Sequence, residues 1–391
     1  MSAITNEDER SRPKALKARR SRARFLKLLP VVIAVAAMGA LGGISWHYSD
    51  ELLTPVRAAG SFDLRILRVE DREVTLPRTE ATSQAGTFGL SFQSRRGTGY
   101  GKIGRVISAG QATVTRRYVP LHGRITPDAR ARVDTFVWQG NPRTALGIPF
   151  TTVPIRDDLG TFPAWHIRGG DGWVIFVHGR GSSRAEALRL VPLVHGLNRS
   201  ALVITYRNDD GVPPSPDGLY HLGASEWHEL AAAVRFARSR GAKRIALVGY
   251  SMGGAIVCEF LRHSSMARFA SAAVLDAPVL NWDATLHLAG AQRNLPSFLI
   301  DAAELAVEQR TAIDFDDLDQ IRHSSEFRVP ILLWHGTADD KVPITASRAF
   351  ARARPGLVTY EEVPGAGHVQ AYNVAKDRYL RTVEGFLRAH T

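Results

Sequence analysis

The chain has 391 residues, of which 45% are hydrophobic and 23% charged, an ordinary globular composition that excludes fibrous and largely disordered proteins. Its formal net charge is +12, and +6 of this comes from residues 1–27, which carry nine Lys or Arg against three acidic residues. The remaining positive charge is scattered and forms no basic stripe, so we expect no nucleic-acid partner.

The first segments of the chain are typical of a membrane anchor. Residues 1–27 are polar and then basic, and we expect them to form a cytoplasmic tail. Residues 28–46 contain no charge, and nineteen helical residues span roughly 28 Å, close to the hydrocarbon core of a bilayer. The positive-inside rule therefore predicts a single-pass transmembrane helix at the cell membrane, with the N-terminus in the cytoplasm and the rest of the chain outside. A cleaved signal peptide and a buried core helix are the alternatives.

The next two segments are a predicted linker, residues 47–60, and a predicted small β-rich module, residues 61–145. Short alternating runs separated by Gly, Pro and polar turns indicate the strands of the module. Within it, residues 99–104 match the pattern G-x-G-x-x-G. A strand-like sequence follows that pattern where dinucleotide binding needs a helix, so we expect no such cofactor.

From about residue 146 to 391, apolar strand-like runs alternate with helical patterns, which predicts an α/β domain with a mostly parallel sheet covered by helices on both faces. Ser251 lies in its motif GYSMGG, between an apolar run and a helix-like segment. In that setting G-x-S-x-G predicts a nucleophile elbow, where Gly249 and Gly253 leave room for a sharp backbone bend. Ser251 is therefore the candidate nucleophile.

A serine hydroxyl needs a base to remove its proton and an acid to hold that base. His368 is the predicted base, because it ends a glycine-rich loop just before the terminal helix. Asp339 is the predicted acid, because it follows a strand-like run at the edge where α/β sites form. Asp340 and Asp276 are the alternatives.

A glycine-rich loop, residues 178–181, follows another buried strand and predicts an oxyanion hole. Gly179 frees the loop backbone, and the N–H groups of Arg180 and Met252 are the expected donors. That role does not need the side chain of Arg180, and His178 is expected to orient the loop.

More than fifty residues separate Asp276 from the strand that begins near Pro330, more than a simple crossover requires, so we expect a helical cap at about residues 279–328. An apolar stripe at helical spacing runs through the cap and consists of Phe298, Leu299, Ala302, Leu305 and Ala306. We expect this stripe either to face the pocket above the nucleophile or to pack on the main domain.

Four motifs, HGRG at 178–181, GYSMGG at 249–254, HGTADDKVP at 335–343 and GAGH at 365–368, occur in the order found in the α/β-hydrolase superfamily. The chain resembles most its serine aminopeptidase and monoacylglycerol-lipase-like branch, although the sequence NDDG at 208–211 departs from the glycine-rich continuation usual there. The resemblance implies an α/β-hydrolase fold and hydrolysis of esters, amides or peptides without a metal or organic cofactor.

The combined prediction is a membrane-anchored serine hydrolase that cleaves small-molecule or lipid-like acyl esters through Ser251, His368 and Asp339 and an acyl-enzyme intermediate. A serine peptidase or aminopeptidase and an acyltransferase on the same triad are the enzymatic alternatives. A non-catalytic receptor or scaffold is a third, and the intact set of Ser, His and Asp argues against it. The sequence contains no H-E-x-x-H pattern or clustered ligands that would indicate metal catalysis.

Overall fold

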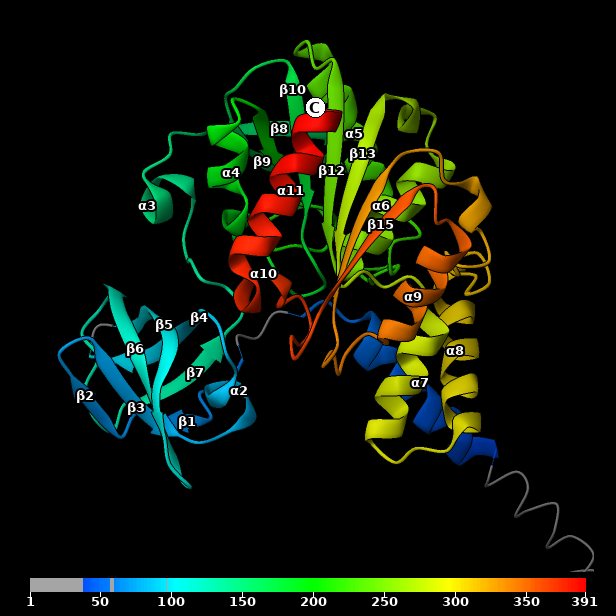
Figure 1. Ribbon diagram of the computed structural model, residues 1–391. Helices are drawn as coiled ribbons and strands as arrows, with labels where there is room; N and C mark the ends of the chain where they lie inside the picture. The colour runs from blue at the N-terminus through cyan, green and yellow to red at the C-terminus, as the bar shows by residue number, and fades with distance from the viewer. Residues whose placement is uncertain (1–37, 57–59, 96) are drawn as a thin grey trace, which may run out of the picture.

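The fold is built on an antiparallel sheet and a mostly parallel sheet (Figure 1). The computed structural model describes residues 38–56, 60–95 and 97–391. Within these residues the first part of the chain forms a seven-stranded sheet and the second part an eight-stranded sheet. Both the antiparallel module and a pair of cap helices lie below the larger sheet in Figure 1, on opposite sides of it.

The module is an antiparallel sheet with its own apolar core. Its strand order is β1-β7-β4-β5-β6-β3-β2. In β3 alternate residues, Val74 and Leu76, are buried, as the period of two requires. In β4 all of residues 88–92 are buried, and Phe88, Leu90 and Phe92 are part of the core. Its elements are β1 (Leu64–Arg65), β2 (Arg68–Glu70), β3 (Glu73–Pro77), α2 (Glu80–Ser83), β4 (Phe88–Ser94), β5 (Gly97–Ala109), β6 (Thr113–His122) and β7 (Arg130–Asp134).

The glycine pattern at residues 99–104 lies inside strand β5. A Cβ atom at Gly99 would lie 2.2 Å from the ring of Phe92, and one at Gly101 would lie 2.3 Å from the ring of Tyr118. These glycines therefore make room for aromatic side chains of the neighbouring strands. The pattern is a packing feature of the sheet, and no helix N-terminus follows it.

The larger sheet has the order β15-β14-β13-β12-β10-β11-β9-β8. Its strands β8 and β9 form an antiparallel hairpin that pairs with β11, and the other neighbouring pairs are parallel. The strands are β8 (Thr151–Asp157), β9 (Gly160–Ile167), β10 (Gly172–Val177), β11 (Ser200–Val203), β12 (Arg244–Tyr250), β13 (Ala270–Asp276), β14 (Ile331–Gly336) and β15 (Val358–Val363).

Helices cover both faces of this sheet. In β12, Leu247 faces the apolar cluster that contains residues of α5 and α6, and Val248 faces the cluster that contains residues of α4 and α11. This alternation gives a three-layer domain. The helices are α3 (Pro142–Leu146), α4 (Val191–Gly196), α5 (Trp227–Ser239), α6 (Met252–His263), α9 (Ile344–Ala353), α10 (Ala371–Val374) and α11 (Lys376–His390), with short 3-10 turns η1 (Arg184–Arg189), η2 (Ser265–Phe269) and η3 (Ser324–Glu326).

The cap is a helical hairpin between β13 and β14, formed by α7 (Trp282–Gln292) and α8 (Ser297–Thr311). The structure contradicts both expectations for its apolar stripe, because Phe298 is 60% exposed and Leu305 is 54% exposed. The buried face of α8 instead carries Ile300, Ala303 and Val307. Helical spacing predicted an apolar stripe on α8, but the face of α8 that is buried depends on where its neighbour α7 lies.

The predicted membrane span falls largely outside the described residues, which begin at residue 38. Residues 38–53 form a helix, here called the N-terminal helix, so the predicted linker is helical up to residue 53. Arg310 of α8 hydrogen bonds to the hydroxyl of Ser49 at 2.8 Å, and Leu53 is fully buried. The cap therefore holds a polar side chain of this helix through Arg310, and Leu53 joins the main apolar core. Within the described part of the chain, no helix has the length and apolar character needed to span a membrane.

Candidate active site

Ser251 occupies a strained turn between β12 and α6. Its φ is 52° and its ψ is −120°, a conformation that L-residues rarely adopt. The turn leaves no room for side chains around it, because a Cβ at Gly249 would lie 2.5 Å from the carbonyl oxygen of Gly253. A Cβ at Gly253 would lie 2.3 Å from the carbonyl oxygen of Val177. The local sequence thus forces the hydroxyl group of Ser251 out at the carboxyl end of the sheet.

His368 connects Ser251 to a buried carboxylate. Its Nε2 lies 2.8 Å from Ser251 Oγ, and its Nδ1 lies 2.8 Å from Asp339 Oδ2. Because an ionised carboxylate can only accept, Nδ1 carries a proton and Nε2 is left to accept from the hydroxyl. The structure thus brings together three side chains from loops after β12, β14 and β15.

Asp339 is held as an anion by more partners than the sequence indicated. Its carboxylate is fully buried, and Oδ1 accepts the backbone N–H groups of Lys341 and Val342, each at 2.9 Å. His335 Nε2 lies 3.1 Å from Oδ2. Burial opposes the charge, but the hydrogen bonds from His335 and His368 lower the pKa of Asp339 well below its usual range. No signal in the sequence indicated this partner, because His335 lies in β14 and Asp339 in the loop after it, where a spacing of four residues implies no contact.

The two alternative acids lie elsewhere. The side chain of Asp340 pairs with its exposed neighbour Lys341 at 3.2 Å. Asp276 is buried and accepts a hydrogen bond of 3.0 Å from the hydroxyl of Tyr379, and burial raises its pKa to about 6. Among the described contacts, neither carboxylate hydrogen bonds to His368.

The predicted oxyanion donors are backbone groups on either side of Ser251. Met252 is the first residue of α6, so its N–H has no acceptor within the helix. In the loop that follows β10, the N–H of Gly179 is already used, because it donates to Glu186 Oε2 at 2.9 Å. The next N–H along this loop, that of Arg180, is therefore the expected oxyanion donor. In the described residues, no protein acceptor is found for the N–H of Arg180 or Met252.

The side chain of Arg180 has a role that the sequence did not indicate. Its Nε donates to the carbonyl oxygen of Leu52 at 3.1 Å, and its Nη2 donates to that of Glu51 at 2.7 Å. These carbonyls belong to the last turn of the N-terminal helix, where no helical N–H remains to pair with them. The guanidinium group also lies over the ring of Tyr220. The side chain of Arg180 therefore joins the loop that carries the expected oxyanion donor, by hydrogen bonds, to a helix almost 130 positions earlier in the chain.

His178 orients the same loop from the other side. Its Nε2 lies 2.8 Å from Asp209 Oδ2, and its ring stacks on Tyr206. Burial disfavours a charged ring, but the carboxylate of Asp209 raises the pKa of His178 above its usual value. The segment NDDG at 208–211, which departs from the family pattern, thus supplies the partner of His178.

Ser251 and His368 open into a cavity of about 680 Å³, here called the nucleophile cavity. One of its walls comes from the β-rich module and includes Thr79, Glu80, Gln84, Val133 and Phe136. Gln84 also donates to the carbonyl oxygen of Gly365 at 2.9 Å, in the loop that carries His368. The module is therefore part of the site, which composition and strand patterns could not indicate.

The wall is stiffened by a buried arginine of strand β6. The guanidinium group of Arg116 has no exposed surface and donates to the carbonyl oxygens of Thr82, Gln84, Gly86 and Gly104. These bonds fix α2 and the turn after it. The side chains that face the nucleophile cavity from this turn are held in place by a residue that does not touch the cavity.

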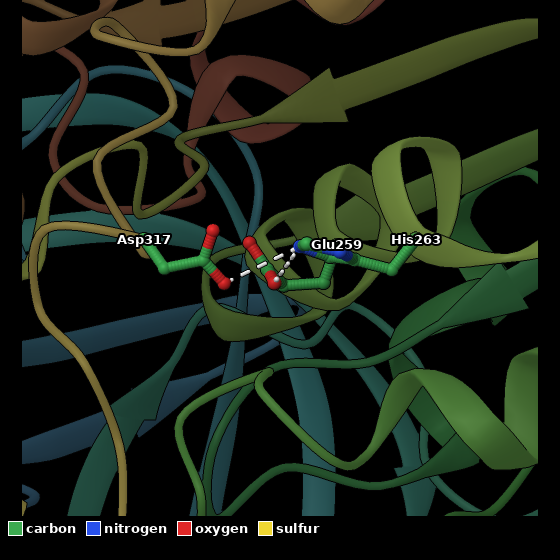
Figure 2. Close-up of side chains that lie close together, drawn as sticks. All are labelled: Glu259, His263 and Asp317. Atoms are coloured by element: carbon green, nitrogen blue, oxygen red, sulfur yellow. Dashed lines mark ion pairs between the residues drawn. The ribbon is translucent and has the colours of Figure 1, made fainter.

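Among the residues that the structure describes, two clusters of side chains have the spacing of metal ligands, and neither lines the nucleophile cavity. Figure 2 shows the first, in which His263 Nε2 lies 3.2 Å from Glu259 and 3.3 Å from Asp317. Arg262 pairs with the same two carboxylates at 3.1 and 2.7 Å, so their charge already has a partner. This cluster ties the last turn of α6 to the chain that returns from the cap. The second cluster joins α7 to α8 and consists of Asp283, His287 and Glu304.

The β-rich module and the α/β domain match different family models. Residues 65–134 match a domain of unknown function (DUF8805). An uncharacterized protein of Mycobacterium tuberculosis is 28% identical over 208 residues, which is 52% of this chain and 65% of that protein's length.

The fold is also similar to that of solved structures. An esterase from Pyrococcus furiosus superposes with a TM-score of 0.52 at 20% identity, over 65% of this chain and 95% of the esterase. A puromycin-hydrolyzing peptidase of Mycobacterium tuberculosis superposes with a TM-score of 0.51 at 14% identity, over 82% of this chain and 46% of the peptidase. Residues 174–381, more than half of the chain, match the model of the alpha/beta hydrolase family. The chain therefore belongs to the alpha/beta hydrolase family.

Proposed function

We propose that the protein is a serine hydrolase that cleaves acyl esters through Ser251, His368 and Asp339. The observation that carries this proposal is the unbroken hydrogen-bonded path from Ser251 Oγ through both nitrogens of His368 to Asp339, with both distances at 2.8 Å. The strained turn at Ser251 and the buried, anionic Asp339 support it.

In this mechanism His368 takes the proton of Ser251 as the hydroxyl oxygen attacks the ester carbonyl. The N–H groups of Arg180 and Met252 stabilise the negative charge that develops on the carbonyl oxygen. His368 then donates its proton to the leaving alcohol, and an acyl-enzyme remains. A water molecule, deprotonated by His368, attacks the acyl group and releases the carboxylic acid. Asp339 holds the ring and stabilises its cationic form throughout.

A peptidase is the second candidate. Asp63, Glu80 and Asp340 line the nucleophile cavity, and carboxylates at that place could bind the ammonium group of a peptide N-terminus. The fold of a puromycin-hydrolyzing peptidase is similar to that of this chain. Parallel assays with p-nitrophenyl esters and aminoacyl p-nitroanilides distinguish the two activities.

The decisive experiment is labelling with a fluorophosphonate, which reacts only with an activated serine. We expect the native protein to be labelled and the variants Ser251→Ala and His368→Ala to remain unlabelled, with ester turnover reduced by several orders of magnitude in each. Ser182 lines the same cavity and contacts Glu186, so Ser182→Ala is the matched control and should keep the label. Full labelling of folded Ser251→Ala would falsify the assignment.

We also propose that residues 28–46 anchor the protein in the cell membrane, with the catalytic domain outside the cytoplasm. The basic tail before this segment supports the orientation. Protease added to intact cells should remove a tag at the C-terminus, while a cytoplasmic marker protein stays protected. Protection of the tag until lysis would reverse the orientation, and recovery of the protein in the soluble fraction would indicate a cleaved signal.

A further inference from the structure

A second cavity of about 150 Å³ lies between the N-terminal helix and the two cap helices, and we call it the cap cavity. Figure 1 shows this helix beside α7 and α8 at one end of the molecule. The walls are mainly aliphatic and include Leu52, Leu286, Leu295, Ile300, Ala303 and Val307. An enclosed apolar cavity of about 150 Å³ takes up an apolar ligand of about six carbons, which sets the size of the hydrocarbon group that the cap cavity can hold.

The charged groups on the walls are already paired. Arg293 donates to Glu51 Oε2 at 2.8 Å, and Arg180 donates to the carbonyl oxygens of Glu51 and Leu52. An occupant therefore finds apolar surface and no unpaired charge, which favours a hydrocarbon group over a charged one.

Arg180 connects this cavity to the chemistry, because it lines both the cap cavity and the nucleophile cavity. Its backbone N–H is the expected donor to the carbonyl oxygen of the substrate. Because Arg180 is shared by the two linings, a chain attached to that carbonyl would reach the aliphatic walls along the stem of this residue.

We propose that the cap cavity holds the far end of the acyl chain of the substrate and makes the enzyme selective for medium-chain esters. This inference rests on the proposed ester hydrolysis at Ser251. The N-terminal helix, which lies outside the residues that match the hydrolase family, thereby forms part of the substrate site. Each methylene that enters the cavity should raise kcat/KM about fourfold until the cavity is full.

Two opposite substitutions test the proposal with p-nitrophenyl esters from acetate to dodecanoate. Ala303→Leu fills the cavity and should lower kcat/KM for octanoate about tenfold or more while acetate changes less than twofold. Ile300→Ala enlarges the cavity and should move the optimum to a longer chain. Leu305→Ala, on the exposed face of the same helix, is the matched control and should keep the native profile. Thermal unfolding confirms that each variant is folded.

A binding assay separates failure of this inference from failure of the ester mechanism. In the inactive variant Ser251→Ala, 1-octanol should raise the melting temperature, and added Ala303→Leu should abolish that shift. If octanol binds in this way but the native protein hydrolyses no ester, the cap cavity is confirmed as a hydrocarbon-binding site and the proposed ester hydrolysis is refuted. The proposal would be overturned if the ratio of kcat/KM for octanoate to kcat/KM for acetate were unchanged in both folded cavity variants. It would also be overturned if octanol still raised the melting temperature after Ala303→Leu. Either result would mean that the cavity is a packing void.

Discussion

Replacing Arg180 with alanine removes the guanidinium group that joins the oxyanion loop to the N-terminal helix. In the native protein this group donates to the carbonyl oxygens of Glu51 and Leu52 at 2.7 and 3.1 Å. Those carbonyls have no helical partner, and a cation at a helix C-terminus also meets the negative end of the helix dipole. The substitution therefore loosens both the end of the helix and the backbone that carries the expected oxyanion donor.

The size of the effect follows from these contacts. A hydrogen bond from a charged donor contributes about 1.5–3 kcal/mol, so the loss of two should weaken docking of the helix by about 3–6 kcal/mol. Complete loss of one oxyanion donor costs about 10²–10³ in kcat. Because the N–H of residue 180 remains and is only displaced, we expect kcat to fall by about 10-fold to 100-fold.

The change in kcat is measured by steady-state kinetics with p-nitrophenyl acetate. This substrate is chosen because its acetyl group is too short to reach the cap cavity, so that changes in that cavity do not affect the result. We expect kcat to fall while KM changes less than threefold, and Arg180→Lys to recover part of kcat because it restores a cation at the helix end. Arg293→Ala is the control, because Arg293 binds the side chain of Glu51 without touching the oxyanion loop. An unchanged kcat in folded Arg180→Ala would refute the reasoning and return the side chain to a purely structural role.

Three further predictions test other parts of the site. Asp339→Asn should lower kcat by about 10⁴, as loss of the triad acid does elsewhere, and a larger loss in Asp276→Asn would reverse the assignment of the acid. Burial raises the pKa of Asp276 from 3.8 to about 6. Between pH 3.8 and 6 the folded protein therefore binds more protons at Asp276 than the unfolded chain does. Its stability should fall as pH rises from 3.8 to 6, by up to about 3 kcal/mol, and Asp276→Asn should remove this dependence in thermal unfolding. Asn373→Ala should leave the carbonyl oxygens of Thr87 and Thr135 without their donor, and limited proteolysis should release the module faster, whereas an unchanged rate would contradict its role at the contact.

The nucleophile turn could be predicted from the sequence because its determinants are consecutive. A buried strand, two glycines around Ser251 and a helix that begins at once impose the bend locally, whatever the rest of the chain does. The α/β pattern of residues 146–391 could be predicted for the same reason, since the periods of strands and helices are local properties.

The sequence favoured Asp339 as the acid but left Asp276 open as an alternative. Asp276 is the last residue of β13 and Asp339 follows β14, and strand register places Asp276 beside Trp334 on β14. Only the packed structure turns the carboxylate of Asp276 toward Tyr379 and that of Asp339 toward His368. Sequence position gives the edge of the sheet on which a carboxylate lies, whereas its hydrogen-bond partner depends on helices and loops contributed by distant residues.

The walls of the site were likewise decided by the tertiary structure. The module contributes Gln84 to the His368 loop, the N-terminal helix receives the side chain of Arg180, and α8 turns Phe298 to solvent. Each contact, or the lack of one, involves elements that are far apart in the chain or whose apolar faces match several partners. A periodic pattern identifies an apolar face, but the surface that covers it is determined only when the whole chain has packed.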